Sequence, residues 1–156
     1  MSTLLFDAIR DEKTEQVEIL LQEHPDWINE KDNRGSTPLL LATYYGYKPI
    51  TEVILKHKPN INAQDASGNT ALMGVCFKGH NDIAKLLIEH DANVNITNFN
   101  GATALIYAAT FGKTELVKLL VENGADVNIK DDRGNTALDH AQMQNATTII
   151  ELLKSK

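Results

Sequence analysis

The chain is poor in the residues and segments that mark several protein classes. Cys76 is the single cysteine among 156 residues, so no internal disulfide can form, which suits a reducing cytosol. No run approaches the roughly 18 apolar residues of a membrane-spanning helix. The N-terminus also lacks the basic segment and apolar stretch of a secretory signal. These absences predict a cytoplasmic protein without a membrane partner, although an effector exported by another route would share them.

Positive charge is also scarce. The chain has 15 Lys and Arg against 21 Asp and Glu, a formal net charge of −6. Because nucleic-acid binders usually carry a basic face and no Lys/Arg run occurs here, we expect no nucleic-acid partner. The acidity modestly favours a partner with a basic surface through electrostatic steering. Hydrophobic residues make up 42% of the chain, enough for one continuous core, so residues 1–156 are predicted to form a single domain.

One pattern recurs four times at a spacing of 33 residues. A glycine is followed two residues later by Thr-x-Leu, and an asparagine precedes each glycine by six residues. The glycines are Gly35, Gly68, Gly101 and Gly134, and the asparagines are Asn29, Asn62, Asn95 and Asn128. Such a period is typical of a solenoid, in which each repeat buries its apolar face against its neighbours. The predicted repeats are 3–34, 35–67, 68–100, 101–133 and 134–156, the first of them degenerate.

The pattern of each repeat predicts two helices. Thr103 stands where an N-cap is needed, and Leu105 with Ala108 forms an apolar helical stripe that Gly112 ends. A second helix starts near Thr114. By the period, first helices are expected at 37–45, 70–78, 103–111 and 136–144. Polar residues replace apolar ones in the first and last repeats, which predicts solvated capping repeats at both ends.

These motifs resemble ankyrin repeats over essentially the whole chain. The residues that carry the resemblance are Gly-x-Thr-Pro-Leu at 35–39, Gly-x-Thr-Ala-Leu three more times, and Asn-Gly-Ala-Asp-Val-Asn at 123–128. The opening residues 5–10 resemble the capping repeat of free-standing bacterial ankyrin proteins. The resemblance implies an all-α solenoid of about five helix-turn-helix repeats joined by hairpin-like finger loops. It also implies a monomeric, non-enzymatic protein-binding module, a scaffold or an inhibitor, without a cofactor.

The sequence departs from the family pattern at three kinds of position. The histidine that usually follows Thr-Pro-Leu is replaced by Leu40, Met73, Ile106 and Asp139, which predicts more apolar packing there. Lys58 and Asp91 stand where glycine usually follows the second helix. A non-glycine residue in the left-handed conformation costs about 1 kcal/mol. Because Pro59 further restricts Lys58, the loop at 57–60 is expected to be remodelled.

The third departure is Gly74, inside a predicted helix, where glycine costs about 1 kcal/mol relative to alanine. Its equivalent in the next repeat is Tyr107. The plain explanation is a large ring that packs beside the missing side chain. The alternative is a notch for a partner, and a groove near Gly74 and Tyr107 would favour a small molecule or peptide as the ligand.

The resemblance also implies where a partner binds, because family members mostly use a concave face lined by finger loops and first helices. Tyr44 and Phe77 are equivalent by period, and Tyr45 with Phe111 lies in the adjacent row. Aromatic residues are common binding hot spots, although packing between helices is the alternative. The predicted partner-binding residues are Asn33, Arg34, Ser36, Tyr44, Tyr45, Ser67, Asn69, Phe77, Lys78, Phe99, Asn100, Thr110, Phe111, Asp132, Arg133 and Met143.

Catalytic and metal-binding patterns are weak. His24, His57 and His90 recur every 33 residues, but stacked helices lie about 8–10 Å apart, too far for a shared metal. We expect these histidines in solvent at the ends of the second helices. His140 follows Asp139, but helix neighbours point to different sides, which makes a poor catalytic dyad.

Cys76 falls at a position that favours a small side chain, so a buried structural thiol is expected. The sequence therefore predicts no catalytic, metal or cofactor site. Two alternatives remain open. Catalytic turnover at Asp139 and His140 would indicate an enzyme, and self-association through the aromatic row would indicate a homo-oligomer.

Overall fold

The computed structural model describes residues 2–156, which form ten α-helices, one short 3-10 helix and no strand. The helices pair in chain order into the five predicted repeats. The elements are α1 Thr3–Arg10, α2 Thr14–Glu23, η1 Pro25–Asn29, α3 Pro38–Tyr44, α4 Lys48–Lys56, α5 Ala71–Lys78, α6 Asn81–Glu89, α7 Ala104–Thr110, α8 Thr114–Glu122, α9 Ala137–Met143 and α10 Thr147–Lys154.

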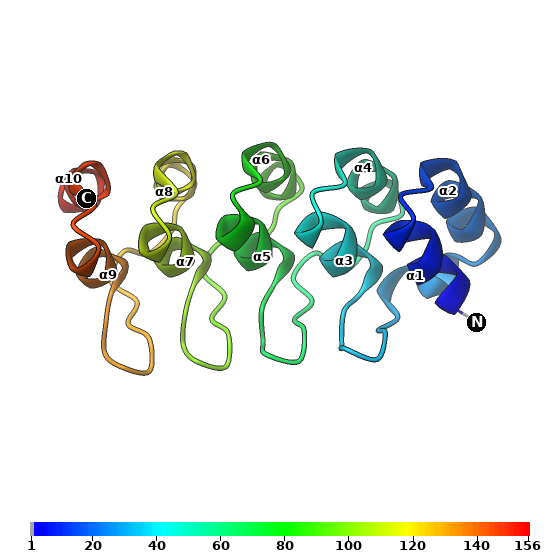
Figure 1. Ribbon diagram of the computed structural model, residues 1–156, viewed down its shortest axis with the longest axis horizontal. Coiled ribbons are helices and arrows are strands. Elements are labelled where there is room, and N and C mark those ends of the chain that lie inside the picture. Colours follow the sequence, from blue (N-terminus) through cyan, green and yellow to red (C-terminus); the bar gives the residue numbers. More distant parts are fainter. Residues whose placement is uncertain (1) are drawn as a thin grey trace.

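The helix pairs stand side by side in one row, with the two termini at opposite ends (Figure 1). The first helices, from α1 to α9, form one layer, and the second helices, from α2 to α10, form the other. Long finger loops project from the layer of first helices (Figure 1). Each α-helix contacts its partner helix and the equivalent helix of a neighbouring repeat. This is the solenoid that the 33-residue period predicts. Within residues 2–156, no helix has the length and apolar character needed to cross a bilayer.

Threonine caps set the start of every first helix after the first repeat. The hydroxyl oxygens of Thr37, Thr70, Thr103 and Thr136 each accept a backbone N–H from three residues further on, at 3.2–3.3 Å. These threonines have extended backbone angles, so the helices begin one residue later than the ranges expected from the sequence. A cap of this kind stabilises a helix by about 1 kcal/mol.

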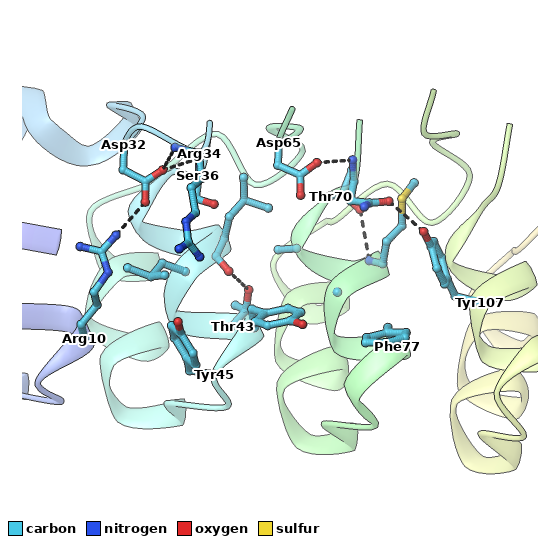
Figure 2. A pocket seen from close by; sticks show the side chains of 17 residues that line it. Arg10, Asp32, Arg34, Ser36, Thr43, Tyr45, Asp65, Thr70, Phe77 and Tyr107 are labelled. Carbon is cyan, nitrogen blue, oxygen red and sulfur yellow. Dashed lines mark hydrogen bonds and ion pairs between the residues drawn. The ribbon is translucent and has the colours of Figure 1, made fainter. Parts of the chain in front are cut away.

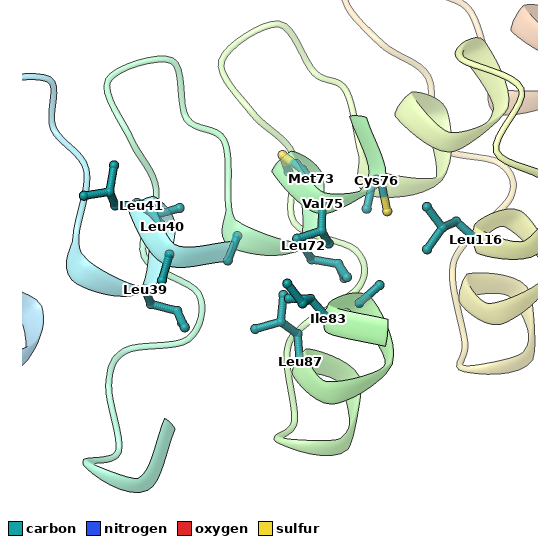
Figure 3. Close-up of a cluster of buried hydrophobic side chains, with 14 of the residues drawn as sticks. Leu39, Leu40, Leu41, Leu72, Met73, Val75, Cys76, Ile83, Leu87 and Leu116 are labelled. Atoms are coloured by element: carbon teal, nitrogen blue, oxygen red, sulfur yellow. The ribbon is translucent and has the colours of Figure 1, made fainter. Parts of the chain in front are cut away.

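The core runs between the two layers. Leu39 of α3 and Leu72 of α5 are almost fully buried, and so is Leu87 of α6 (Figure 3). Leu40, Met73 and Ile106 are buried as well, which confirms the apolar packing predicted where the family histidine is missing. Cys76 is buried in the same core, and burial raises the pKa of its thiol to about 12. The thiol is therefore protonated and structural at neutral pH.

Asparagine side chains link each repeat to the next. The side-chain oxygen of Asn29 accepts the backbone N–H of Asn60, and Asn62 does the same for Asn93. Asn95 continues the series with Asp126, and the distances are 2.7–2.9 Å. These bonds explain why asparagine keeps the 33-residue interval.

The loop at 57–60 lacks one backbone hydrogen bond that the equivalent loops of the third and fourth repeats have. Lys58 and Asp91 are left-handed, with φ of 53° and 67°, as predicted. Ala92 donates its N–H to the carbonyl of Leu87, whereas Pro59 has no N–H to donate at the equivalent place. The link from Asn60 to the preceding repeat is retained. The expected remodelling therefore amounts to one missing bond.

The N-terminal repeat contains an element that the period did not predict. The 3-10 helix η1 follows α2 and buries Trp27, whose ring stacks on His24 with centroids 3.9 Å apart. Because the sequence Pro25-Asp26-Trp27 does not recur in the other repeats, no pattern in the chain indicated this helix.

Candidate functional site

Aromatic rings gather at the ends of the first helices. The side chains of Tyr44, Tyr45, Phe77 and Phe111 are 41–46% exposed, and Phe99, on a finger loop, is 68% exposed. They also touch one another: the Phe77 and Phe111 rings meet edge to face at 4.9 Å. The rings therefore pack sideways while a large part of each stays open to solvent.

Most of the other predicted binding residues are also exposed, and none is buried. Ser36, Asn69 and Thr110 are half-buried. The Thr110 hydroxyl donates to the carbonyl of Ile106 at 2.7 Å, and the side-chain oxygen of Asn69 accepts from Asn98 at 2.9 Å. Asn69 and Thr110 therefore take part in the scaffold's own hydrogen bonding.

The structure brings part of the predicted set together in one groove of about 480 Å³. The groove lies over the second and third repeats, between the finger loops and the first helices (Figure 2). The predicted residues that line it are Arg34, Ser36, Tyr44, Tyr45, Asn69 and Phe77. Lys78 lies beside it, with its ammonium 5.1 Å from the centre of the Tyr44 ring. Asn33, Ser67, Phe99, Asn100, Thr110, Phe111, Asp132, Arg133 and Met143 lie outside the groove.

Gly74 forms part of the groove wall. A Cβ built on Gly74 would meet only the Cδ1 atom of Tyr44, at 3.5 Å. A large ring does lie beside Gly74, as expected, but it is the ring of Tyr44 and not that of Tyr107, whose hydroxyl contacts Asn98 at 3.2 Å and Asn69 at 3.3 Å. Figure 2 shows Tyr107 at the edge of the groove. The missing side chain therefore leaves space.

An Asp or Asn holds every finger turn in the same way. Asp32, Asp65, Asn98 and Asp131 are spaced by 33 residues. In each, Oδ1 accepts two backbone N–H groups, from the residues two and four positions later, at 2.9–3.0 Å. This is ordinary Asx turn chemistry, and it leaves the second side-chain atom for another partner.

The second atom has a side-chain partner in three of these four turns. Arg10 donates to Oδ2 of Asp32 at 3.0 Å, and Nε2 of His140 lies 2.7 Å from Oδ2 of Asp131. Asn98 instead donates its Nδ2 hydrogens to the Tyr107 hydroxyl and to Asn69. Among residues 2–156, Oδ2 of Asp65 has no hydrogen-bond or ion-pair partner.

Sequence reasoning missed this arrangement, although a signal was present. Gly74, Tyr107 and His140 occupy the same position of the repeat, so the period alone showed that the third repeat lacks the side chain that meets the finger turn. Arg10 could not be found this way, because its equivalents are Thr43 and Cys76.

The acid–base groups around α9 take part in a helix cap and a finger turn. Asp139 caps α9 by accepting the backbone N–H of Thr136 at 2.9 Å, while His140 pairs with Asp131. Burial raises the pKa of Asp131, but hydrogen bonds from His140 and from the Asn135 and Arg133 backbones outweigh it and hold that pKa below its ordinary value. The backbone N–H and hydroxyl of Thr136 lower the pKa of Asp139.

The three periodic histidines end second helices, as expected, but their surroundings differ. His24 stacks on Trp27, Nδ1 of His90 lies 2.9 Å from the carbonyl oxygen of Leu86, and Nε2 of His57 lies 3.0 Å from Oε2 of Glu18. His24 and His57 are half-buried, in contrast to the solvated position expected for them, whereas His90 is exposed as expected. Over residues 2–156, no group of three or more His, Cys, Asp or Glu side chains is placed to hold a metal ion.

Comparison with known proteins completes this description. A family model described as ankyrin repeats (3 copies) matches residues 5–98, and one described as ankyrin repeats (many copies) matches residues 87–141. No curated protein matches the chain. Ankyrin repeats are generally protein–protein interaction modules and are typically non-enzymatic. The chain belongs to the ankyrin-repeat family.

Proposed function

We propose that the chain is a non-enzymatic module that binds another protein on the face lined by its finger loops and first helices. The exposed row of Tyr44, Tyr45, Phe77 and Phe111 carries this proposal. Large rings left in solvent on one continuous face are typical of an interface, and Tyr is among the residues that contribute most to binding. The bound module would act as a scaffold, or as an inhibitor that covers the active site of an enzyme.

The scaffold supports binding with little rearrangement. Threonine caps, asparagine links and a continuous core fix each first helix, so a partner meets preformed rings. Polar residues at the finger tips, such as Arg34 and Asp132, would form the rim. We propose a monomeric, cytoplasmic module and a protein partner with a basic surface, because the chain carries a net charge of −6.

A comparative pull-down from native lysate tests this function. The Tyr45→Ala/Phe111→Ala double variant removes two rings that are nearly half exposed, and Ile19→Ala removes a similarly exposed apolar side chain from α2, in the other layer. Circular dichroism first establishes that all proteins fold. A partner retained by the wild type and by Ile19→Ala, but lost by the double variant, would support the proposed face. Equal capture by all three would place the binding site elsewhere.

The groove beside Gly74 supports a second candidate, a small molecule or short peptide as the ligand. Its volume of about 480 Å³ lies within the range of ligand pockets. Native mass spectrometry after incubation with a metabolite extract would reveal a ligand of defined mass. If Gly74→His, which fills the groove, retained the same ligand, this candidate would be excluded.

A further inference from the structure

The groove contains one carboxylate oxygen for which residues 2–156 provide no partner, Oδ2 of Asp65. We propose that an arginine side chain of the bound protein enters the groove at Gly74, donates to this oxygen and lies against the surrounding rings. This inference rests on the proposed function, because a partner protein must bring the arginine. It assigns the groove one recognition element, a guanidinium group.

The other finger-turn carboxylates indicate which chemistry fits. Both of them are paired with nitrogen donors from first helices: Asp32 with the Arg10 guanidinium and Asp131 with the His140 imidazole. The turn of Asp65 lacks the equivalents of both donors. Gly74 replaces His140, and Thr43, the equivalent of Arg10, is buried with its hydroxyl donating to the carbonyl of Leu39 at 2.8 Å.

The first repeat shows how a guanidinium sits at such a turn. Nη2 of Arg10 lies 3.0 Å from Oδ2 of Asp32, and its Cζ lies 6.0 Å from the centre of the Phe6 ring (Figure 2 shows the ion pair). The groove offers the same two features, a carboxylate oxygen at Asp65 and the rings of Tyr44 and Phe77.

Space and charge favour arginine over other donors. Outside its own helix backbone, a Cβ on Gly74 would have a single neighbour within 4 Å, the Tyr44 ring, so the groove has room at this position. Hydrogen bonds between charged groups are about twice as strong as neutral ones, which favours a cation over tyrosine. The flat guanidinium stacks on aromatic faces, whereas the lysine ammonium is a compact and strongly hydrated charge.

Two cationic side chains oppose an incoming cation. The ammonium of Lys78 lies 5.1 Å from the centre of the Tyr44 ring, beside the groove. Arg34 lines the groove itself, its side chain is exposed, and among residues 2–156 it has no ion pair. Its positive charge repels an incoming arginine and competes for Asp65. Arg34→Ala should therefore bind an arginine probe at least as tightly as the wild type does.

A titration with peptides, followed by ¹H–¹⁵N NMR, tests the proposal without knowledge of the partner. The probe is acetyl-Gly-Arg-Gly-amide at millimolar concentration, and the matched peptide contains citrulline, which has the same shape without the charge. We expect the arginine peptide to shift the amide signals of Ser67 and Asn69, which donate to Asp65, and the signal of Gly74. The citrulline peptide should bind at least fivefold more weakly.

Three variants locate the probe. Asp65→Asn keeps the turn, since Asn98 holds the equivalent turn of the next repeat, but removes the charge. Gly74→His supplies an internal donor that copies the His140 and Asp131 pair. Both should weaken the arginine peptide at least fivefold. Asp131→Asn is the control, because its partner is internal, and it should leave the affinity unchanged.

Each outcome decides the proposal. Equal binding of the arginine and citrulline peptides, or binding that survives Asp65→Asn, would overturn it, and tighter binding of a tyrosine peptide would replace arginine by an aromatic donor. Weaker binding by Arg34→Ala would also contradict it. Failure of this inference differs from failure of the proposed function: a partner lost by the Tyr45→Ala/Phe111→Ala variant in a pull-down, with no arginine peptide bound, would leave the protein-binding function intact.

Discussion

The third and fourth repeats, residues 68–100 and 101–133, share a scaffold and differ in what they present. Thr70 and Thr103 cap their first helices in the same way, and Leu72 and Leu105 are equally buried. Only one of the two first helices carries a side chain at the position that meets its finger turn, Tyr107 in α7 as opposed to Gly74 in α5. Positions that keep the same residue in each repeat thus build the fold. A position whose residue differs between repeats decides whether the groove is closed or open beside the finger turn.

The largest effect is expected from opening the fourth repeat with Tyr107→Gly. This change removes the hydroxyl bonds to Asn98 and Asn69, the ring packing against Phe77 and Phe111, and a helix-favouring residue. We expect the free energy of unfolding to fall by about 3 kcal/mol. Urea denaturation measures it.

Tyr107→Phe divides that loss into its parts, because it removes only the hydroxyl. The expected cost is about 1 kcal/mol. If Tyr107→Phe lowered the free energy of unfolding as much as Tyr107→Gly does, the ring would contribute nothing. The third and fourth repeats would then differ only in the hydrogen bonds of the Tyr107 hydroxyl.

The sequence was sufficient for the fold because the signals that define it are local and repeated. The threonine of each Thr-x-Leu caps a helix through an N–H only three residues away, and the asparagine interval corresponds to a real bond between neighbouring repeats. The 3-10 helix around Trp27 was missed because it occurs once. Averaging over repeats gives no information about a segment without equivalents.

The site was predicted less well because it depends on side-chain direction. The period shows that Tyr107 and Gly74 are equivalent positions of neighbouring repeats. It does not show whether the Tyr107 ring lies against Gly74, because a ring at this position can turn toward either neighbouring repeat. Its hydroxyl is held at the finger turns, and Tyr44 from the preceding repeat approaches Gly74 instead. The exposure of Tyr45 and Phe111 could be predicted because their positions follow the buried stripe of each first helix.

A pair of alanine substitutions separates space from backbone conformation. At Gly112, φ is +70° and nothing lies within 4 Å of a built Cβ, so Gly112→Ala should cost about 1 kcal/mol through the left-handed backbone alone. At Gly74 the backbone is helical and Tyr44 is in ordinary contact, so Gly74→Ala should stabilise the protein by up to about 1 kcal/mol. Thermal unfolding compares both with the wild type. If Gly74→Ala were destabilised, the space beside Gly74 would have to be too small for a methyl group.

The loops after the second helices offer a smaller test. Asp91 is left-handed in the third repeat, where the fourth has Gly124. Asp91→Gly relieves about 1 kcal/mol of strain, but glycine also increases the entropy of the unfolded chain, which offsets part of that gain. We therefore expect about 0.5 kcal/mol of net stabilisation in urea denaturation. A net loss would mean that the aspartate side chain stabilises its loop.

The smallest effect is expected from acid, and it distinguishes the finger turns by their chemistry. The pKa of Asp131 is lowered in the folded protein, so its contribution is present above the unfolded value of 3.8 and is lost as pH falls through the lower folded value. The equivalent residue of the third repeat, Asn98, does not titrate. Hydrogen exchange between pH 5 and pH 3, corrected for intrinsic rates, should therefore show loss of protection around Gly134 and Asn135, with the turn at Gly101 unaffected. Equal loss at both turns would mean that acid acts on the whole solenoid, because only one of the two turns contains a carboxylate.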